Sequence, residues 1–450
     1  MVKIATKSIP TARFKGRFAD LNAFRSDPPV HLRKCKEKYG DTFHLDLLFQ
    51  KAMITSDPEV ARHVLQTNNK NYIKDLAYRK LKLALGNGLL MNEGESWMAQ
   101  RRLAQPAFYK KRLEGLFDTM VETTERFITQ FEQYRGSKTS INITTEMNTV
   151  TSDVALDTLL GGNRYGDNTD IQQTISRTQK YIVGRIRYPW TIPFSHINGR
   201  HRQFKTDLHR FDKVIYDIID KQRREHNAED NHLLSMLLEA RDEDTGEQMT
   251  DQQLRDELIT IYVAGHETSA NALSWTWYLL TQHPDIYRRL KDEVRTTLGT
   301  RRPTLADLRA LPFARQVMEE AMRLYPPAWV VGREALQEDE AKGYPIPKHG
   351  IVIVSICNLH RDGRYWENPD QFDPDRFTPE RNKERHRGVY IPFGLGPRMC
   401  IGNNFALMEI QLIIMMMVQH FDFELDTTHS VVPEALITLR PKYGVKVFVK

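Results

Sequence analysis

The sequence has few cysteines and no long apolar run. Its 450 residues include three cysteines, Cys35, Cys357 and Cys400, which lie far apart and are odd in number. They form neither a disulfide framework nor a zinc spacing, so we expect a reducing compartment, the cytoplasm. No segment reaches the roughly 18 apolar residues that span a bilayer. The basic start, Met1 to Phe14, lacks the apolar core of a signal peptide, and a weak organellar presequence is the alternative interpretation.

Strong charge and compositional bias are also missing. Hydrophobic residues make up 40% of the chain and charged residues 27%, which is ordinary for a globular protein. The net charge of +6 comes from basic residues interleaved with acidic ones, so we do not expect nucleic-acid binding. A prior of roughly 150 residues per domain suggests two or three domains. Because repeats, low-complexity tracts and linkers are not found, we expect one monomeric domain, residues 1–450.

Hydrophobic periodicity predicts a mainly α fold with a small β region. Alternation and β-forming residues predict a hairpin from Gly40 to Ser56 and short strands at Ile351–Ile356 and Tyr443–Val449. Strands and helices do not alternate along the chain, so a dinucleotide-binding domain is disfavoured. Helical periodicity predicts helices at Asp57–Gln66, Glu95–Ala104, Leu113–Tyr134, Ile143–Leu160, Asp207–His226, Asp251–Gln282 and Asn404–Val418.

The helix predicted from Asp251 to Gln282 is long. Thr250 and Gln253 form a capping box at its start, and Pro284 follows its end. About 32 residues with a rise of 1.5 Å each give roughly 48 Å. The helix is apolar on both sides of a polar centre, Ala264 to Ser269, so we expect it to be largely buried.

The most informative stretch is Phe393–Gly402, which reads FGLGPRMCIG. Its glycines tolerate positive φ and let the backbone approach a flat partner. A thiol beside backbone N–H groups and an arginine is biased toward thiolate, the form that ligates metal. The spacing Phe-x-x-Gly-x-Arg-x-Cys-x-Gly resembles the haem-binding sequence of the cytochrome P-450 superfamily, the haem-thiolate monooxygenases. A buried structural cysteine is the alternative interpretation.

This resemblance implies a cofactor and a fold. Cys400 would be the axial ligand of the iron in haem b, and Arg398 would pair with a haem propionate. Phe393, Gly394 and Gly402 would line the cofactor. A thiolate ligand pushes electron density onto the iron and favours O–O cleavage. The fold implied is the cytochrome P-450 fold, with the long central helix over the haem.

The polar centre of the long helix has a motif of its own. Gly265 costs about 1 kcal/mol relative to alanine inside a helix, and Thr268 can donate to the Ala264 carbonyl, which would open a groove for water or dioxygen. The segment resembles the oxygen-activation motif of the family. Thr268 and Glu267 would then be catalytic, with Glu267 relaying protons, and Ala264 would contact the haem. A polar kink in a buried helix is the alternative, and we interpret His266 as structural.

A buried ion pair is expected on the helix that begins near Pro312. Glu320 and Arg323 lie three residues apart and share a helix face. Taken alone, such a pair is usually a solvated surface bridge. Here it resembles the Glu-x-x-Arg motif of the family, with Arg376 as a third member. All three would be structural residues.

A second helix carries an aromatic residue and an arginine one turn apart, Trp97 and Arg101. Arginine binds carboxylate oxygens through paired N–H groups. The pair resembles the family's helix that contacts a haem propionate, although an amphipathic surface helix is the default interpretation. Arg333 would serve the other propionate.

The substrate pocket is expected to be apolar, because positioning rather than charge chemistry is required. The segment Tyr181–Phe194 resembles the mobile lid region of the family. The run Glu319–Pro327, with Ala264–Thr268, resembles the fatty-acid-hydroxylating branches, so we expect a fatty acid or a similar lipid. Lys51 is a candidate partner for a carboxylate, or simply solubilising. Candidate walls, for which core packing is the alternative, are Leu89, Leu90, Ile261, Ala264, Ala328, Trp329 and Val330.

The function implied is a monooxygenase that activates dioxygen with two electrons and hydroxylates a hydrophobic small molecule. Neither a membrane anchor nor a fused redox module is recognised, so we expect a separate ferredoxin or flavodoxin with its reductase. The alternatives are a peroxide-driven peroxygenase, a non-enzymatic haem-thiolate sensor or carrier, and a haem-free helical binding module. A basic docking surface, or else dispersed charge, is expected at Arg101, Arg102, Lys110, Lys111, Arg112, Lys383, Arg385 and Arg387.

Overall fold

Segments that are distant in the sequence combine into two units. Unit 1 contains Met1–Leu76, Gln316–Cys400 and Val432–Lys442, and unit 2 contains Ala77–Arg315, Ile401–Val431 and Tyr443–Lys450. The computed structural model describes residues 7–14, 16–46, 51–160, 174, 177–178, 181–182, 184–185, 192–225, 232–242 and 246–450. Among these residues, no helix combines the length and the apolarity needed to cross a membrane.

Unit 1 contains a five-stranded sheet with the order β1-β2-β8-β5-β3. The predicted hairpin is confirmed as β1 (Thr42–Asp46) antiparallel to β2 (Lys51–Thr55), and the predicted strand near residue 351 is β8 (Ile351–Ser355). β2 and β8 pair in parallel, so they need a long connection, which here includes Ala77–Arg315 of unit 2. The remaining strands of the sheet are β5 (Val330–Ala335) and β3 (Tyr72–Ile73).

Helices and two small strand pairs complete unit 1. The apolar side chains of the sheet are divided between two buried clusters. Met53 and Val352 lie in one cluster with Trp366, and Ala52 and Ile54 lie in the other. The strand pairs are β6 (Asp339–Ala341) with β7 (Tyr344–Ile346), and β10 (Pro433–Ala435) with β11 (Leu439–Pro441). The helices are α1 (Arg17–Ser26), α2 (Pro28–Tyr39), α3 (Pro58–Arg62), the π-helix η1 (His63–Thr67), η2 (Asn69–Asn71), α17 (Ile356–Leu359), η6 (Pro374–Phe377), α18 (Pro379–Glu384) and η7 (Gly396–Arg398).

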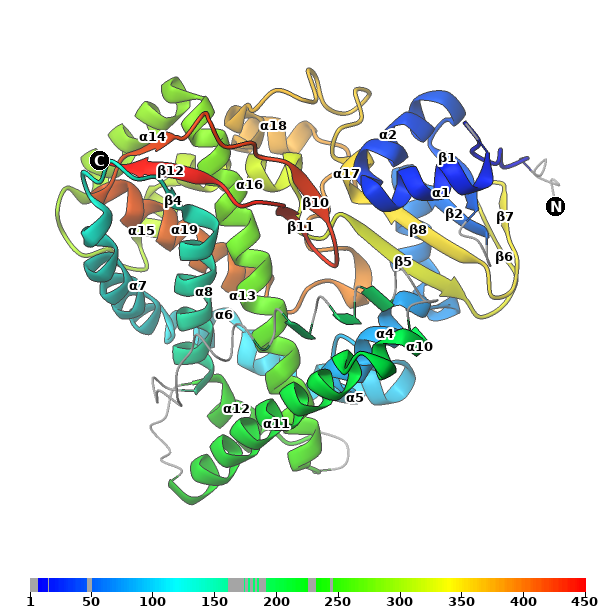
Figure 1. Ribbon diagram of the computed structural model, residues 1–450, viewed down its shortest axis with the longest axis horizontal. Helices are drawn as coiled ribbons and strands as arrows, with labels where there is room; N and C mark the ends of the chain where they lie inside the picture. Colours follow the sequence, from blue (N-terminus) through cyan, green and yellow to red (C-terminus); the bar gives the residue numbers. More distant parts are fainter. Residues whose placement is uncertain are drawn as a thin grey trace. The chain divides into compact units, whose positions relative to one another are not determined.

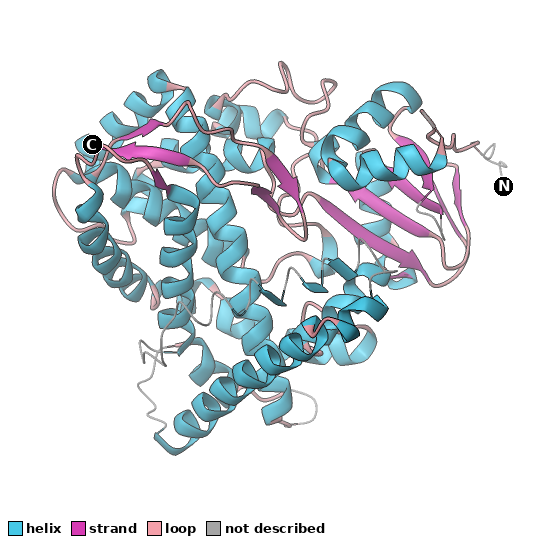
Figure 2. Ribbon diagram, viewed as in Figure 1, coloured by secondary structure: helices cyan, strands magenta, loops and turns pink. Residues whose placement is uncertain are grey.

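Unit 2 is mostly helical (Figures 1 and 2). Its described residues include a three-stranded sheet with the order β4-β12-β9, from β4 (Ile141–Asn142), β12 (Lys446–Val449) and β9 (Phe423–Leu425). α16 (Pro312–Leu324) begins in unit 2 and ends in unit 1. The other helices are α4 (Leu76–Leu85), α5 (Gly94–Ala104), η3 (Gln105–Phe108), α6 (Lys110–Glu114), α7 (Phe117–Phe131), η4 (Glu132–Tyr134), α8 (Ile143–Leu160), α10 (Ile192–Ile197), α11 (Arg200–Glu225), α12 (Leu233–Glu239), α13 (Asp251–Gln282), α14 (Pro284–Leu298), α15 (Asp307–Ala310) and α19 (Asn403–His420).

The long helix α13 has the predicted bounds and the predicted cap. The backbone N–H of Gln253 donates to Thr250 Oγ1 at 3.2 Å, and the Thr250 N–H donates to Gln253 Oε1 at 2.8 Å. α13 packs against α8, α11 and α19, and Figure 1 shows α8 running alongside it. Trp275 and Trp277 are fully buried in its second half. The helix is therefore the central element of unit 2.

Several predicted bounds differ from the structure. The helix predicted over Leu113–Tyr134 is broken at Gly115, whose N–H bonds to the Arg112 carbonyl in a turn. The helix predicted over Asp57–Gln66 changes to the π-helix η1 after Arg62. α11 begins seven residues earlier than predicted, at Arg200. These differences lie at helix ends and turns, which hydrophobic periodicity predicts least accurately.

Candidate functional site

The Cys400 loop belongs to unit 1 and is shaped by two glycines. Gly394 and Gly396 have φ values of +77° and +74°, which L side chains rarely adopt. A Cβ on Gly396 would lie 2.1 Å from the carbonyl oxygen of Leu65 in η1, so only glycine fits there. The Cys400 N–H donates to the Phe393 carbonyl at 2.9 Å and closes the loop.

Cys400 differs from the other two cysteines in its exposure. Cys35 and Cys357 are buried, and burial raises the pKa of each thiol to about 12. Both are therefore protonated at neutral pH and cannot serve as thiolate ligands. Cys400 is exposed, as are the side chains of Met399 and Pro397 beside it. Among the three thiols, only Cys400 is accessible to a metal.

The centre of α13 is open on one side. Ala264 is exposed and Gly265 is half-buried, although most of the helix around them is buried. A Cβ built on Gly265 would meet no atom within 4 Å. Thr268 Oγ1 donates to the Ala264 carbonyl at 2.7 Å, the bond that the sequence predicts. The helix thus leaves a small-residue face open for a flat partner, with a hydroxyl next to it.

The opposite face of this centre is closed. His266 is 6% exposed, stacks on Tyr262 and shares a 3.0 Å hydrogen bond with the Tyr262 carbonyl through Nδ1. Burial lowers the pKa of His266, so it is neutral at pH 7. Thr151 of α8 donates to the His266 carbonyl at 3.0 Å. Glu267, the other predicted catalytic residue, is half-buried.

The predicted propionate partners lie in both units. Trp97 and Arg101 are half-buried one turn apart on α5 in unit 2, and Arg101 Nε donates to Gln105 at 3.3 Å. Arg398 is half-buried in η7 of unit 1. Arg333 is 7% exposed in β5, where its Nη1 donates to the Gly332 carbonyl at 2.9 Å.

The Glu320–Arg323 pair is buried as the sequence predicts. Both side chains are fully buried, and Arg323 binds Glu320 through two bonds of 2.6 and 2.7 Å. Arg376 Nε lies 3.3 Å from Glu320. Arg323 also donates to three backbone carbonyls, of His360, Pro369 and Gln371. The pair therefore ties α16 to the loops that follow α17.

The candidate pocket walls differ in their surroundings. Leu89 is buried and Leu90 packs against a cluster that contains Ile182 and Phe204. Ile261 is half-buried on α13. Ala328 and Val330 are half-buried against the core of unit 1. The structure places Trp329 inside that core, with its Nε1 donating to the Leu436 carbonyl at 3.1 Å. Half of the predicted lid, Tyr181–Phe194, lies outside the described residues.

The residues present fit a haem. An exposed thiol follows a loop whose backbone packs closely on η1, and an exposed alanine with an open glycine interrupts a buried helix. The candidate propionate partners are Trp97 and Arg101 in unit 2 and Arg333 and Arg398 in unit 1. Their side chains are half-buried or buried. A cysteine thiolate is one of the axial ligands that hold haem iron.

Sequence reasoning missed a buried acid on α19. Glu409 is 1% exposed, and neither of its carboxylate oxygens has a hydrogen-bond partner among the described residues. Burial raises its pKa to about 8, and the hydroxyl of Ser269 on α13 acts against this shift. The only signal in the sequence is one acid inside the apolar run that follows Cys400.

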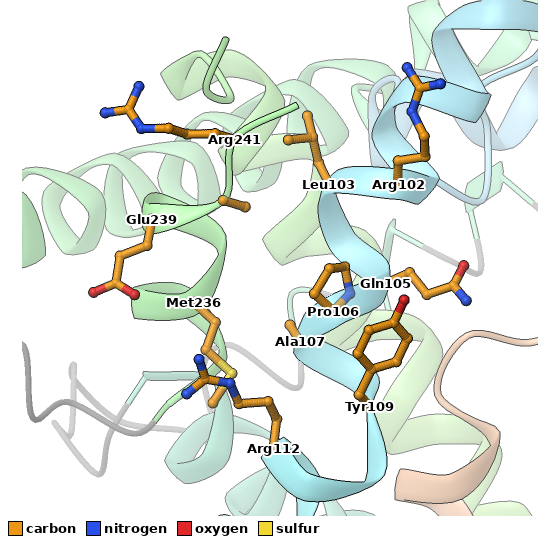
Figure 3. A pocket seen from close by; sticks show the side chains of 11 residues that line it. Arg102, Leu103, Gln105, Pro106, Ala107, Tyr109, Arg112, Met236, Glu239 and Arg241 are labelled. Atoms are coloured by element: carbon orange, nitrogen blue, oxygen red, sulfur yellow. The ribbon is translucent and has the colours of Figure 1, made fainter. Parts of the chain in front are cut away.

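A separate hollow of about 420 Å³ lies in unit 2 between the α5–α6 segment and α12 (Figure 3). Three arginines, Arg102, Arg112 and Arg241, stand at different points around it. Arg102 pairs with Asp242 at 3.0 Å. The hollow contains none of the predicted haem, catalytic or substrate residues.

The predicted basic surface needs one correction. Arg385 lies over the rings of Trp366, Phe377 and Tyr390, and its guanidinium donates to the Arg376 carbonyl. Burial lowers the pKa of Arg385. The guanidinium of Arg385 therefore contacts groups of unit 1, whereas the side chains of Lys383 and Arg387 are exposed.

Comparison with known proteins identifies the family. The cytochrome P450 family model matches residues 13–447. The putative cytochrome P450 132 of Mycobacterium bovis is 33% identical over 412 residues, which cover 87% of this chain and 86% of that protein. The cyclooctat-9-en-7-ol 5-monooxygenase of Streptomyces melanosporofaciens is 30% identical over 387 residues, 86% of this chain and 83% of that protein. A crystal structure of the cytochrome P450DA haem domain matches with a TM-score of 0.91 and 25% identity, over 99% of this chain and 98% of that one. This chain therefore belongs to the cytochrome P450 family.

Proposed function

We propose that this cytochrome P450, a haem-containing monooxygenase, hydroxylates a fatty acid or a similar lipid with electrons from separate redox partners. The observation that carries the proposal is the open centre of α13, where Ala264 is exposed and Thr268 donates to its carbonyl. A hydroxyl held at an open, apolar helix face is suited to guide a proton to dioxygen. We further propose that residues 1–450, both units together, form one haem-thiolate domain.

Several residues have proposed roles in holding the haem. Cys400 would supply the thiolate, and Phe393, Gly394 and Gly402 would line the haem. Trp97, Arg101, Arg333 and Arg398 bind the propionates, because arginine pairs with carboxylate oxygens through two N–H groups. When bound, the haem supplies dioxygen binding and O–O cleavage, which a thiolate ligand favours. Glu320, Arg323 and Arg376 are structural and act through the fold.

The chain's own catalytic groups handle protons. Thr268 donates its hydroxyl proton to the Ala264 carbonyl, so the lone pairs of its oxygen are free to accept a hydrogen bond. Glu267 is half-buried one residue away and supplies protons from solvent. A proton relay through Glu267 and Thr268 favours oxygen activation with two electrons over peroxide-driven chemistry, which does not require such a relay.

The proton relay is tested with Thr268→Ala. We expect normal haem binding, while hydrogen peroxide per NAD(P)H consumed rises and hydroxylated product falls. Thr281→Ala is the matched control, because its hydroxyl makes the same bond to the carbonyl four residues earlier, 3.0 Å to Trp277. Equal coupling in both variants would contradict the proposed role. Fast turnover with peroxide alone, and none with electron donors, would instead establish a peroxygenase.

The ligand role of Cys400 is tested by absorption of the reduced, carbon-monoxide-bound protein. We expect a red-shifted thiolate band in the wild type and its loss in Cys400→Ser. Cys357→Ser is the control, because that thiol is buried and protonated. A thiolate band that persists in Cys400→Ser would refute the assignment. Haem binding without any product, even with electrons supplied, would support the sensor or carrier.

The substrate class is tested by the spectral shift on substrate binding. In this proposal Leu89, Leu90, Ile261 and Ala264 of unit 2 would supply an apolar lining, which suits a long alkyl chain. We expect saturable shifts with lauric and palmitic acids. A second candidate is a cyclic alcohol, because one relative is named for its action on cyclooctat-9-en-7-ol. Shifts with cyclic terpene alcohols and none with the acids would favour that candidate.

The electron donor is proposed to be a ferredoxin or flavodoxin with a reductase, and the compartment the cytoplasm. The exposed basic residues Lys110, Lys111 and Arg112 give one surface for an acidic partner. A monomer is expected in solution. Substitution of these three residues by serine should raise KM for the donor at low salt, with less effect at high salt.

A further inference from the structure

A segment between α4 and α5, Gly86 to Leu89, lies closely against α13. A Cβ on Gly88 would be 2.3 Å from Thr260 Oγ1 and 2.5 Å from the Asp256 carbonyl oxygen. A Cβ on Gly86 would be 2.1 Å from Asp256 Oδ1, and its φ is +68°. Both glycines are therefore required for this close approach.

Two neighbouring carboxylates on α13 hold this segment by its backbone. Asp256 Oδ2 accepts the N–H of Asn87 at 2.6 Å, and Glu257 Oε2 accepts the N–H of Leu89 at 3.1 Å. The two acids are 4% and 0% exposed. Burying a carboxylate is costly unless it is hydrogen-bonded, whereas a bond from N–H to a charged oxygen is strong.

The segment is also held from α5. Gln100 Nε2 donates to the Asn87 carbonyl at 3.0 Å, and Gln100 Oε1 accepts from Asn92 at 2.5 Å. Gln100 is 3% exposed. Both the N–H and the carbonyl of Asn87 are thus fixed, one by α13 and one by α5.

An arginine extends the network to α11. Arg255 donates through Nη1 to Asp256 at 2.7 Å and through Nε to Asp212 at 2.8 Å. Arg255 is 8% exposed, so water screens these ion pairs weakly. The carboxylate that holds Asn87 is therefore itself held by a residue of α11.

We propose that Asp256 and Glu257 are positioning residues that set substrate selectivity by fixing Leu89 and Leu90 against α13. The inference rests on the proposed function in one respect, that these leucines and Ile261 line the substrate pocket. Gly88 lies on Thr260, the residue before Ile261, so the network fixes the spacing of two walls within unit 2. Neither acid touches the substrate.

The first test measures whether the acids hold the segment, independently of any substrate. Hydrogen exchange of peptides spanning residues 86–92 is compared between the haem-loaded wild type and Glu257→Leu. We expect exchange about tenfold faster or more in the variant, the factor for the loss of one charge-assisted hydrogen bond. Glu257→Gln keeps an acceptor oxygen and should restore slow exchange.

Glu293→Leu is the matched control. Glu293 of α14 is a buried carboxylate of the same kind, which accepts the backbone N–H groups of Phe313 and Ala314 at 2.8 and 2.9 Å. Its replacement should speed exchange near residues 312–315 and leave 86–92 unchanged. Unchanged exchange at 86–92 in Glu257→Leu would overturn the proposal.

The second test measures selectivity. The affinity ratio of 4-phenylimidazole to imidazole, read from the visible spectrum, reports the pocket walls without any reaction. We expect this ratio to change at least about threefold in Glu257→Leu and Asp256→Asn, with a broader distribution of hydroxylated palmitic acid isomers. Neither change is expected in Glu293→Leu. Faster exchange with an unchanged ratio would show that the segment is no pocket wall, which refutes the proposal.

Failure of the proposed function is distinguishable from failure of this inference. If the wild type oxidises no fatty acid, the substrate class is wrong, while the azole ratio still decides the role of the acids. Should Glu257→Leu fail to accumulate, Gly88→Ala disturbs the same contact from the other side and should change exchange and ratio alike. Gly363→Ala is its control, because a Cβ there meets no atom within 4 Å.

Discussion

Two buried glutamates, one in each unit, differ in their hydrogen-bond partners. Glu320 in unit 1 is fully buried and receives two bonds from Arg323, one from the N–H of Asp373, and the nearby charge of Arg376. Glu409 in unit 2 is equally buried, yet neither of its oxygens has a hydrogen-bond partner among the described residues. Burial raises the pKa of both.

The difference teaches how each acid can contribute. Glu320 is surrounded by groups that oppose the cost of burial, so its removal or that of its partner breaks a network. Glu409 avoids the cost by holding a proton, because its pKa of about 8 keeps it mostly neutral at pH 7. Glu320 is the centre of a buried ion-pair network, and Glu409 is a buried neutral acid on the helix after Cys400.

The largest effect on stability is expected from breaking the ion-pair network around Glu320. Arg323→Leu should lower the free energy of unfolding by about 3–5 kcal/mol, because Glu320 and three carbonyls lose their donor in a dry site. Urea unfolding of the haem-loaded protein measures this. Arg295→Ala removes an exposed pair with Asp292 and should cost at most about 1 kcal/mol. Similar losses in the two variants would contradict the comparison, and Arg323→Lys should fall between them.

The next effect is a pH dependence from Glu409. Its pKa is near 4.5 when unfolded and about 8 when folded, so the folded state binds the extra proton between these values. Stability due to this group is therefore fully present below pH 4.5 and lost as pH rises toward 8, by at most about 1.4 kcal/mol per pH unit. Glu409→Gln should remove this slope in unfolding measured at pH 5, 6.5 and 8. An unchanged slope, or the same change in the exposed control Glu95→Gln, would refute the assignment.

His360 in unit 1 should give a slope of the opposite sign. It is fully buried, accepts the N–H of Ile391 at 2.9 Å, and burial beside Arg323 lowers its pKa to about 3. The unfolded state takes up the proton first, so stability is lost as pH falls from about 6.5 toward 3. Only the part above roughly pH 4 is accessible before general acid denaturation, so the change is smaller than for Glu409. His360→Gln, which keeps an acceptor for Ile391, should flatten it, and a slope as steep as in the wild type would contradict the role.

The parts that could be predicted from the sequence are those with local causes. The bounds and cap of α13 follow from periodicity and from Thr250 with Gln253, which interact within one turn. The Cys400 loop follows from glycines at positions of positive φ. The Thr268 bond to Ala264 is likewise set by helix geometry. In each case the sequence spacing alone brings the groups together.

The parts that could not be predicted depend on distant segments. β5 is a strand because it pairs with β8 and β3, and its own sequence gives a weak signal. Arg385 was expected on a docking surface, but aromatic rings from other segments enclose it. The roles of Asp256 and Glu257 depend on where the segment Gly86–Leu89 lies. No periodicity identifies which backbone N–H a buried acid will bind.

The smallest expected effect on stability tests the interaction between Glu409 and the hydroxyl of Ser269. The Ser269 hydroxyl is buried and interacts only weakly with Glu409, so Ser269→Ala should change stability at pH 5 by less than about 0.5 kcal/mol. Because this hydroxyl acts against the raised pKa of Glu409, its loss should raise that pKa further and lower stability above pH 8 relative to the wild type. The effect should vanish in Glu409→Gln, since residues in one interaction give non-additive changes. A loss at pH 9 that persists in the double variant would mean that Ser269 acts through packing and that Glu409 has no electrostatic partner on α13.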